Sequence, residues 1–335
     1  MFNNFGNGED MLMQHSKLDL LLDNTRLPVI CAPMFLVSGT ELVIEACKSG
    51  IIGSFPLLNA RTGEILEEWM TQIKEELAEA KTLHPDKEIA PWAVNLIVHK
   101  SNKRYESDLE LIRKYEPPIV ITSLGKPTSV VEIVHGYGGL VFSDVATLTH
   151  AKKAAETGVD GLILVSNGAG GHGGTLNPLA FIASVKQFWN GITLLAGSVT
   201  NGRDILATQA LGADFAYMGT RFIAASESLA NDIYQNTLIE STAEDIVYTD
   251  AFSGVNANYL IKSIVNAGLD PEKLKKKDIV DVSHSDSKAW KDIVSAGHGV
   301  GTIDKVQTVN EIVNELEEEY KEGLVKLNSG KILQR

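Results

Sequence analysis

The chain alternates between short apolar or β-branched runs and longer segments with the periodicity of amphipathic helices. The short runs are continuously apolar, which is typical of strands that are buried on both faces of a parallel sheet. Candidate strands span residues 28–33, 51–55, 91–98, 118–124, 139–144, 160–165, 192–197 and 214–219. A helical segment follows each of them, at residues 39–49, 62–82, 103–115, 127–136, 146–157, 178–190, 202–211 and 222–236. Eight such units predict an α/β fold, a closed parallel (β/α)8 TIM barrel, with an open doubly wound sheet as the rival architecture.

Turn residues at the segment boundaries support this alternation. Thr200-Asn201-Gly202 is a typical helix start, with Asn201 in the capping position. Gly50, Gly158 and Gly212 each follow a helical segment just before the next strand, where a left-handed residue commonly ends a helix.

The pattern divides the chain into three parts. Residues 1–26 are expected to be a leader, and the first sixteen have neither the basic region nor the apolar stretch of a signal peptide. Residues 27–226 hold the barrel. Residues 227–335 contain helical stretches, a Gly/Asn-rich segment at 252–259 and a final amphipathic helix, and we expect them to form a helical C-terminal cap packed on the barrel.

Composition narrows the functional classes. The formal net charge of −13 over 335 residues disfavours nucleic acid and anionic membranes as partners, and no apolar run approaches the roughly 20 residues that span a bilayer. The two cysteines, Cys31 and Cys47, stand outside any CxxC spacing and suggest a reducing, cytoplasmic location. Because the net charge is negative, any phosphate group of a ligand must be bound locally, by backbone amides rather than by a basic surface.

The loop after the sixth strand is the most unusual part of the chain. Five glycines occur among residues 168–174, and His172 is the functional side chain between them. Glycines allow backbone amides to approach a flat ligand closely. Histidine titrates near neutrality, so His172 is the candidate catalytic acid or base.

The same loop matches the dinucleotide fingerprint G-x-G-x-x-G through Gly168, Gly170 and Gly173. The carboxylate that should follow about 20 residues later is missing, because no Asp or Glu occurs from Thr175 to Arg203. The Rossmann alternative is therefore disfavoured. The remaining histidines form no metal spacing, so no metal site is predicted.

The loops after the seventh and eighth strands resemble a phosphate cradle. In TIM barrels this pair of loops often binds phosphate through backbone amides. Gly197 and Gly219 permit close approach, while Ser198 and Thr220 add hydroxyl donors.

With these motifs in place, the chain resembles the nitronate monooxygenase (formerly 2-nitropropane dioxygenase) family of flavin barrels. The resemblance rests on Ala32-Pro33-Met34, Asn95, the loop Ala169-Gly170-Gly171-His172, Ala196-Gly197-Ser198 and Gly219-Thr220-Arg221-Phe222. Residues 245–260 and 288–293 resemble a subgroup that includes NADH:quinone reductases. The FMN-dependent enoyl reductase of fatty-acid synthesis is a more distant relative class.

The resemblance implies a tightly bound FMN. Its isoalloxazine ring would lie near Ala32, Pro33, Met34 and Asn95, with Ala169, Gly170 and Gly171 beside it. Its phosphate would lie on the segments 196–198 and 218–220, which comprise Ala196, Gly197, Ser198, Met218, Gly219 and Thr220. His172 matches the family's catalytic histidine. Some members have a lysine at the end of the fifth strand, where this chain has Asp144, and Lys126 is a substitute cation nearby.

Three functions follow as alternatives. The first is oxidation of an alkyl nitronate with O2 to a carbonyl compound and nitrite. The second is NADH:quinone reduction on the same FMN barrel, with NAD(P)H docked under a cap formed by Tyr248, Phe252, Asn256, Asn258 and Tyr259. The alternative for the aromatic residues of this segment is that they form the core of the helical tail. The third is a flavin-free barrel that binds a phosphate ligand. We expect a small-molecule substrate in each case, and a homodimer is compatible with all three.

Overall fold

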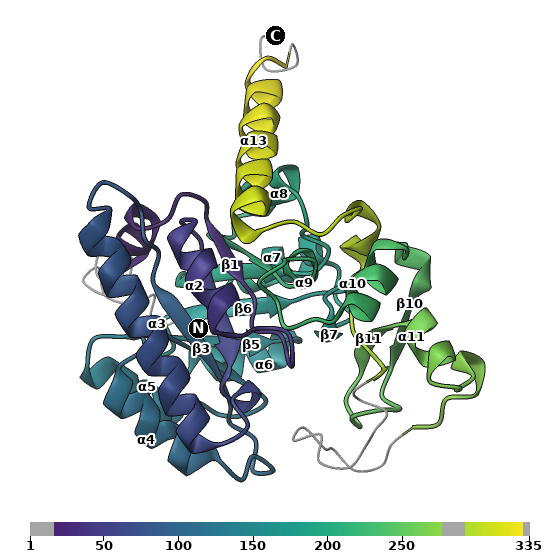
Figure 1. The fold of residues 1–335 in the computed structure, drawn as a ribbon, viewed down its shortest axis with the longest axis horizontal. Coiled ribbons are helices and arrows are strands. Elements are labelled where there is room, and N and C mark those ends of the chain that lie inside the picture. Colours follow the sequence, from purple (N-terminus) through teal and green to yellow (C-terminus); the bar gives the residue numbers. More distant parts are fainter. Residues whose placement is uncertain (1–16, 277–291, 331–335) are drawn as a thin grey trace, which may run out of the picture.

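The computed structural model describes residues 17–276 and 292–330. Its strands are β1 Val29–Cys31, β2 Ile52–Pro56, β3 Trp92–Ile97, β4 Ile119–Ser123, β5 Leu140–Val145, β6 Gly161–Val165, β8 Ile192–Ala196 and β9 Phe215–Met218. They pair in parallel in this order, and β1 closes the ring by pairing with β9 (Figure 1). The predicted parallel (β/α)8 TIM barrel is confirmed, and the rival open sheet is excluded because the two edge strands pair with each other.

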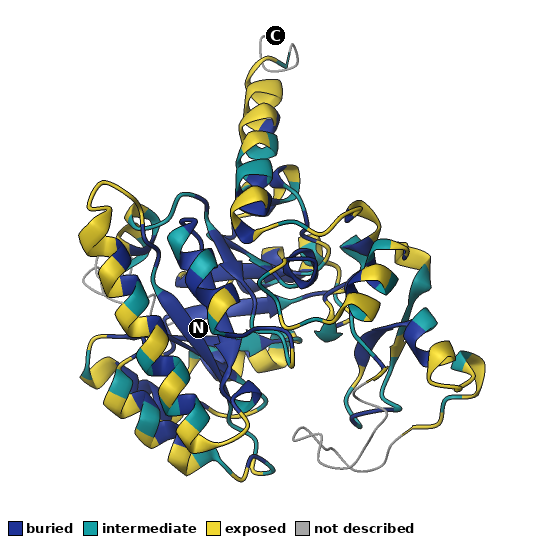
Figure 2. Cartoon of the chain, viewed as in Figure 1, coloured by how far each residue is buried: buried dark blue, intermediate teal, exposed yellow. Residues whose placement is uncertain are grey.

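Helices cover the outside of the barrel between successive strands. They are α2 Thr40–Lys48, α3 Gly63–Leu83, α4 Tyr105–Tyr115, α5 Thr128–Gly136, α6 Leu148–Ala155, α7 Pro178–Val185 and α8 Gly202–Ala210. The expected turn chemistry is present: Asn201 forms a capping box with Asp204, and Gly50, Gly158 and Gly212 have φ of 84°, 81° and 98°. Figure 2 shows the strands as the buried centre and the outer helix faces as exposed.

The eighth outer helix differs from the expectation. The segment 222–236 is not one helix, because α9 Thr220–Ile223 is a single turn and α10 Asp232–Ile239 lies away from the barrel wall. The eighth position is occupied by α13 Val309–Asn328, which packs against α8 and α2. Its apolar face, expected on a cap, joins the core between strands and helices through Val309, Ile312, Val313 and Leu316. The barrel therefore continues beyond residue 226.

The described residues 224–276 and 292–308, here called the lobe, form an insertion between the eighth strand and α13. The lobe was expected to be helical, yet it contains two antiparallel strands, β10 Ile246–Thr249 and β11 Ala257–Leu260. A third strand, β7 Gly171–His172, joins them from the glycine-rich loop. All four residues of β11 are buried, which suits a central strand better than an amphipathic helix. The other described elements of this region are α11 Ile261–Asn266, η2 Ala243–Asp245, η3 Pro271–Lys273 and η4 His298–Thr302.

The expected leader is partly structured. Residues 17–23 are helical, and Leu21 belongs to the core inside the barrel with Ile30 and Ile119. Lys17 Nζ lies 2.7 Å from Asp160 Oδ1 and fixes this helix to the start of β6. This segment therefore closes the amino-terminal end of the barrel. Residues 1–16 of the leader, the basic residue Lys277 and residues 288–291 lie outside the described part of the chain.

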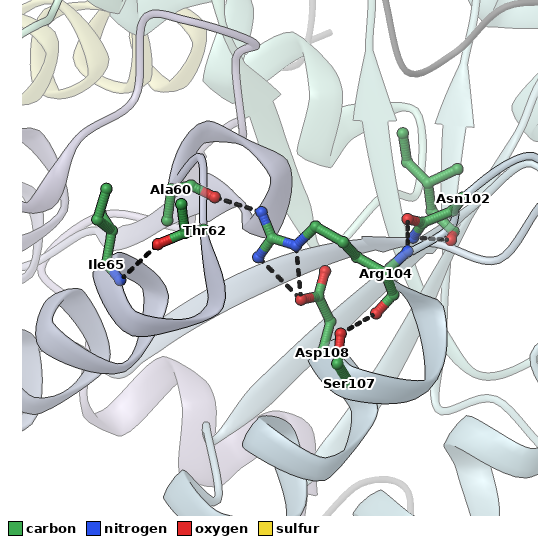
Figure 3. Close-up of polar contacts among 8 residues, drawn as sticks. Ala60, Thr62, Ile65, Asn102, Arg104, Ser107 and Asp108 are labelled. Atoms are coloured by element: carbon green, nitrogen blue, oxygen red, sulfur yellow. Dashed lines mark hydrogen bonds and ion pairs between the residues drawn. The ribbon is translucent and has the colours of Figure 1, made fainter. Parts of the chain in front are cut away.

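The turn at residues 102–104, just before α4, connects two adjacent loops at the carboxyl end of the barrel. Arg104, before α4, donates to the Ala60 carbonyl oxygen and pairs with Asp108 Oδ1 through Nη2 at 2.8 Å (Figure 3). The Asn102 side chain bridges the Ile97 carbonyl oxygen and the Arg104 amide. The loops after β2 and β3 are thereby fixed to each other.

No helix among the described residues is long and apolar enough to cross a membrane.

Candidate functional site

A cavity of about 1380 Å³ lies at the carboxyl ends of the strands, between the barrel and the lobe. Nearly all sequence-predicted site residues line it, and they are Ala32, Pro33, Met34, Asn95, Ala169, Gly170, Gly171, His172, Ala196, Gly197, Ser198, Gly219 and Thr220. They come from five separate segments of the chain. The fold thus brings the predicted residues to one place.

Met218 is the exception. Its side chain is fully buried in the layer between the strands and the outer helices, where it packs with Phe222 and Ile312. Successive side chains of a strand point to opposite faces, so Tyr217 points into the barrel instead and lines the cavity. Only the backbone of Met218 serves the site, because its carbonyl oxygen accepts a hydrogen bond from the Ala32 amide at 2.9 Å.

The cavity floor is a ring of side chains at the carboxyl end of the barrel interior, one from each strand or the position after it. These are Ala32, Pro56, Asn95, Ser123, Asp144, Val165, Ala196 and Tyr217. Half of the floor is apolar and half is polar. A flat ligand could lie on the apolar half and present hydrogen-bonding atoms to the polar half.

The polar half of the floor contains a directed hydrogen-bond chain. Asn95 Nδ2 donates to Ser123 Oγ at 2.7 Å, and Ser123 Oγ donates to Asp144 Oδ2 at 2.5 Å. Asp144 Oδ1 is buried and has no hydrogen-bond partner among the described residues. Burial raises the pKa of Asp144 to about 6, although the Ser123 hydrogen bond opposes that shift.

His172 is held by the lobe. Its Nε2 lies 2.9 Å from Ser253 Oγ, and the Ser253 hydroxyl donates to the Val255 carbonyl oxygen, also at 2.9 Å. The hydroxyl has a single hydrogen, so both contacts are satisfied together when Nε2 carries the imidazole proton, and we assign this tautomer, with Nδ1 as the acceptor. Burial lowers the pKa of His172 to about 4, so the ring is neutral at pH 7. This differs from the titration near neutrality that the sequence suggested.

The loops after β8 and β9, where the sequence predicts a phosphate cradle, line the same cavity. Ser198 has φ of 56°, a left-handed conformation that is rare for serine, and the adjacent Gly197 has φ of 124°. The amides of Ser198 and Val199 have no hydrogen-bond partner in the described part of the chain. An added Cβ at Gly219 would meet Met34 and Ala32 only at ordinary contact distances of 3.5 and 3.7 Å. The space beside Gly219 is therefore open to a ligand.

The lobe closes the cradle from the other side. The Gly297 amide donates to Thr220 Oγ1 at 2.9 Å, and the His298 amide donates to the Gly168 carbonyl oxygen at 2.9 Å. A Cβ at Gly297 would lie 2.5 Å from that same carbonyl oxygen, so only glycine allows this approach. Sequence reasoning missed Gly297 because it lies far from every motif, although a glycine pair flanking His298 is the available signal.

Most residues considered for a nucleotide cap have structural contacts within the lobe or with the glycine-rich loop. Phe252 and Tyr259 pack edge to face, with ring centroids 4.9 Å apart, in the core of the lobe. Tyr248 donates to the Gly173 carbonyl oxygen, and Asn258 donates to that of Ala169. These side chains hold the glycine-rich loop. Of the five residues expected to cap a nucleotide, only Asn256 and Tyr259 line the cavity.

Asp144 lies on the cavity floor, as its position at the end of the fifth strand implied, and Lys126 lines the same cavity. No ion pair joins them among the described residues. The described chain also holds no cluster of His, Cys, Asp or Glu that could bind a metal. Cys31 and Cys47 are free and buried, and burial raises the pKa of both thiols, which keeps them protonated.

The chain is similar to known proteins over most of its length. The family model described as "Nitronate monooxygenase" matches residues 19–319. A nitronate monooxygenase of Neurospora crassa is 26% identical, with 94% of each chain covered. A Rhodococcus jostii (3aS,4S,5R,7aS)-5-hydroxy-7a-methyl-1-oxo-octahydro-1H-indene-4-carboxyl-CoA dehydrogenase is 24% identical over 81% of this chain and 79% of its own.

Solved structures share the fold. A nitroalkane oxidase from Streptomyces ansochromogenes superposes with a TM-score of 0.79 at 21% identity, covering 91% of this chain and 99% of that one. FabK from Thermotoga maritima superposes with a TM-score of 0.73 at 22% identity, covering 93% and 98%. At these identities the structural likeness shows a shared fold.

Proposed function

Because the chain belongs to the nitronate monooxygenase family, and is an oxidoreductase of that family, we propose that it uses FMN to oxidise alkyl nitronates with O2. The products would be a carbonyl compound and nitrite. The observation that carries the proposal is the convergence of a half-apolar floor, an amide cradle and a neutral histidine on one cavity.

The residues present fit an FMN. The phosphate would be bound by the unpartnered amides of Ser198 and Val199, with the Ser198 and Thr220 hydroxyls beside them. The isoalloxazine ring would lie over Ala32 and Ala196, with its polar edge toward Asn95. When bound, FMN supplies a ring that accepts two electrons from the substrate.

His172 supplies the acid–base function in this proposal. A neutral nitroalkane must lose a proton to become a nitronate, and the unprotonated Nδ1 of His172 can accept one. Ser253 keeps Nε2 protonated, so the ring presents a single basic nitrogen. The lobe thus orients the base through Ser253.

NADH:quinone reduction stays the second candidate. A cavity of about 1380 Å³ favours it, because a second planar ligand could lie there with the flavin. The roles of Tyr248, Phe252 and Asn258 weigh against it, since these side chains support the lobe and the glycine-rich loop.

An anaerobic mixing experiment separates the candidates. Purified protein with bound FMN is mixed with propyl nitronate and, separately, with NADH, while the flavin absorbance is followed. We expect bleaching by the nitronate. Rapid bleaching by NADH with none by the nitronate would establish the second candidate, and a colourless protein that takes up no added FMN would establish the flavin-free barrel.

A further inference from the structure

The cavity floor holds an acid that the chemistry described above does not use. Asp144 Oδ2 accepts the Ser123 hydrogen bond at 2.5 Å, while Oδ1 is buried without a partner among the described residues. A buried carboxylate oxygen that lacks a donor is unfavourable by roughly 1–3 kcal/mol or more. Such an arrangement is expected where a ligand or a proton completes the site.

The direction of the hydrogen-bond chain shows which atom is available. Asn95 donates to Ser123 and Ser123 donates to Oδ2, so both donors of the chain are already committed. A further proton can therefore bind at Oδ1. Burial moves the pKa of this carboxyl to about 6, within reach of a proton near neutral pH.

Few other titratable groups act on Asp144. Tyr217 on β9 faces it across the floor, and burial together with the Asp144 charge raises the pKa of Tyr217, so the phenol stays protonated. Lys126 after β4, with His150 and Lys153 on α6, lines the same cavity without an ion pair to Asp144 among the described residues. Within residues 17–276 and 292–330, Asp144 therefore has no paired cation.

We propose that Asp144 takes up a proton when the cofactor on the cavity floor is reduced, which makes it the group that balances the charge of the reduced ring. The inference rests on the proposed function, because it needs a flavin on the floor. Two electrons and one proton leave the reduced ring with one negative charge. A second proton, from solvent, then forms an O–H bond at Asp144 Oδ1, and the total charge on the floor is unchanged.

The test is the midpoint potential of bound FMN as a function of pH, measured by spectroelectrochemistry. In wild-type protein the slope should correspond to two protons per electron pair across neutral pH. In Asp144→Asn it should correspond to one. Tyr217→Phe is the matched control, because it removes the other ionisable group of the floor and should keep the wild-type slope.

Two further measurements make the result decisive. An infrared difference spectrum should gain a protonated-carboxyl band on reduction of the wild type, and Asp144→Asn should lack it. Ser123→Ala removes the hydrogen bond that favours the ionised carboxyl, so the change of slope should move to higher pH, and this variant serves if Asp144→Asn fails to fold. Equal slopes in wild type and Asp144→Asn, with FMN bound, would overturn the inference alone. Protein that binds no FMN would overturn the proposed function as well.

Discussion

At the scale of single residues, strand alternation decides which predictions hold. Asn95 lines the cavity because its side chain points into the barrel. Adjacent residues of a strand point to opposite faces, so Met218 lies in the outer layer while Tyr217 lies on the floor. Short motifs identify a strand end, but they do not state which of two adjacent side chains turns inward. The contact between His172 and Ser253 spans 81 positions, and no local pattern could indicate it.

Replacement of His172 tests its role directly. We expect His172→Ala to keep bound FMN, since backbone atoms of the loop would form its contacts to the ring in the proposed site, and to lower turnover of a neutral nitroalkane by roughly 10²–10⁴-fold. Turnover of the preformed nitronate should fall less, because no proton has to be removed. Steady-state kinetics on both substrates measures the difference, and equal losses on the two would show that His172 is not a base.

The lowered pKa of His172 gives a pH dependence. The imidazole is neutral above its folded pKa of about 4, so kcat/KM for a nitroalkane should lose its base only as the pH falls toward 4. In the unfolded chain the ring binds that proton below its ordinary pKa of 6.5, so the free energy of unfolding should also decrease as the pH falls from about 6.5 to 4. An acid limb at 6.5 in the rate profile would contradict burial of the ring. A limb near 6 that disappears in Asp144→Asn would belong to Asp144 instead.

At the scale of elements, the eight strands and the first seven helices follow from periodicity and turn residues. The eighth helix does not, because the segment after β9 is interrupted and the helix that fills its place begins at Val309. The apolar face of α13 was visible in the sequence, but the surface that it covers was not. Likewise, β10 and β11 pair with each other and with Gly171–His172, so their stability depends on tertiary contacts.

A truncation in α13 tests its place in the barrel. Leu316 is fully buried between α13 and the strands, so Leu316→Ala should lower the free energy of unfolding by about 2–5 kcal/mol. Chemical denaturation measures the change. The matched control is Leu324→Ala on the same helix, where the side chain is exposed and the change should be small. Equal effects of the two substitutions would mean that α13 is only an appended cap.

At the scale of the whole molecule, one cavity joins the barrel to the lobe. Segments from both parts meet at Thr220 and Gly297 and at Gly168 and His298, so a ligand bound beside these contacts would touch both parts. The sequence indicated the barrel half of this arrangement through its strand-end loops. It did not indicate the lobe half, because the contacting residues are ordinary glycines and serines in a region without clear periodicity.

Binding of the proposed FMN should therefore stabilise the barrel and the lobe together. FMN at a hundredfold excess over its Kd should stabilise the folded state by about 2.7 kcal/mol, with a concentration-dependent rise in Tm. Riboflavin, which lacks the phosphate, should stabilise it much less if the amides of Ser198 and Val199 bind that group. Equal stabilisation by the two flavins, measured by thermal melting, would place the phosphate outside the cradle.

The position of α13 also has a consequence for the making of the protein. The lobe's two ends lie side by side, where the Ser226 amide donates to the Gln307 carbonyl oxygen at 2.9 Å, and α13 begins directly after them. On the ribosome, α2 and β1 are made early, yet their neighbour α13 is translated only after the entire lobe. Until α13 has been translated, the side of the nascent barrel that α13 covers stays exposed, including Leu42 and Ala46 of α2. A chaperone that shields apolar surface would find its longest-lived target on that side.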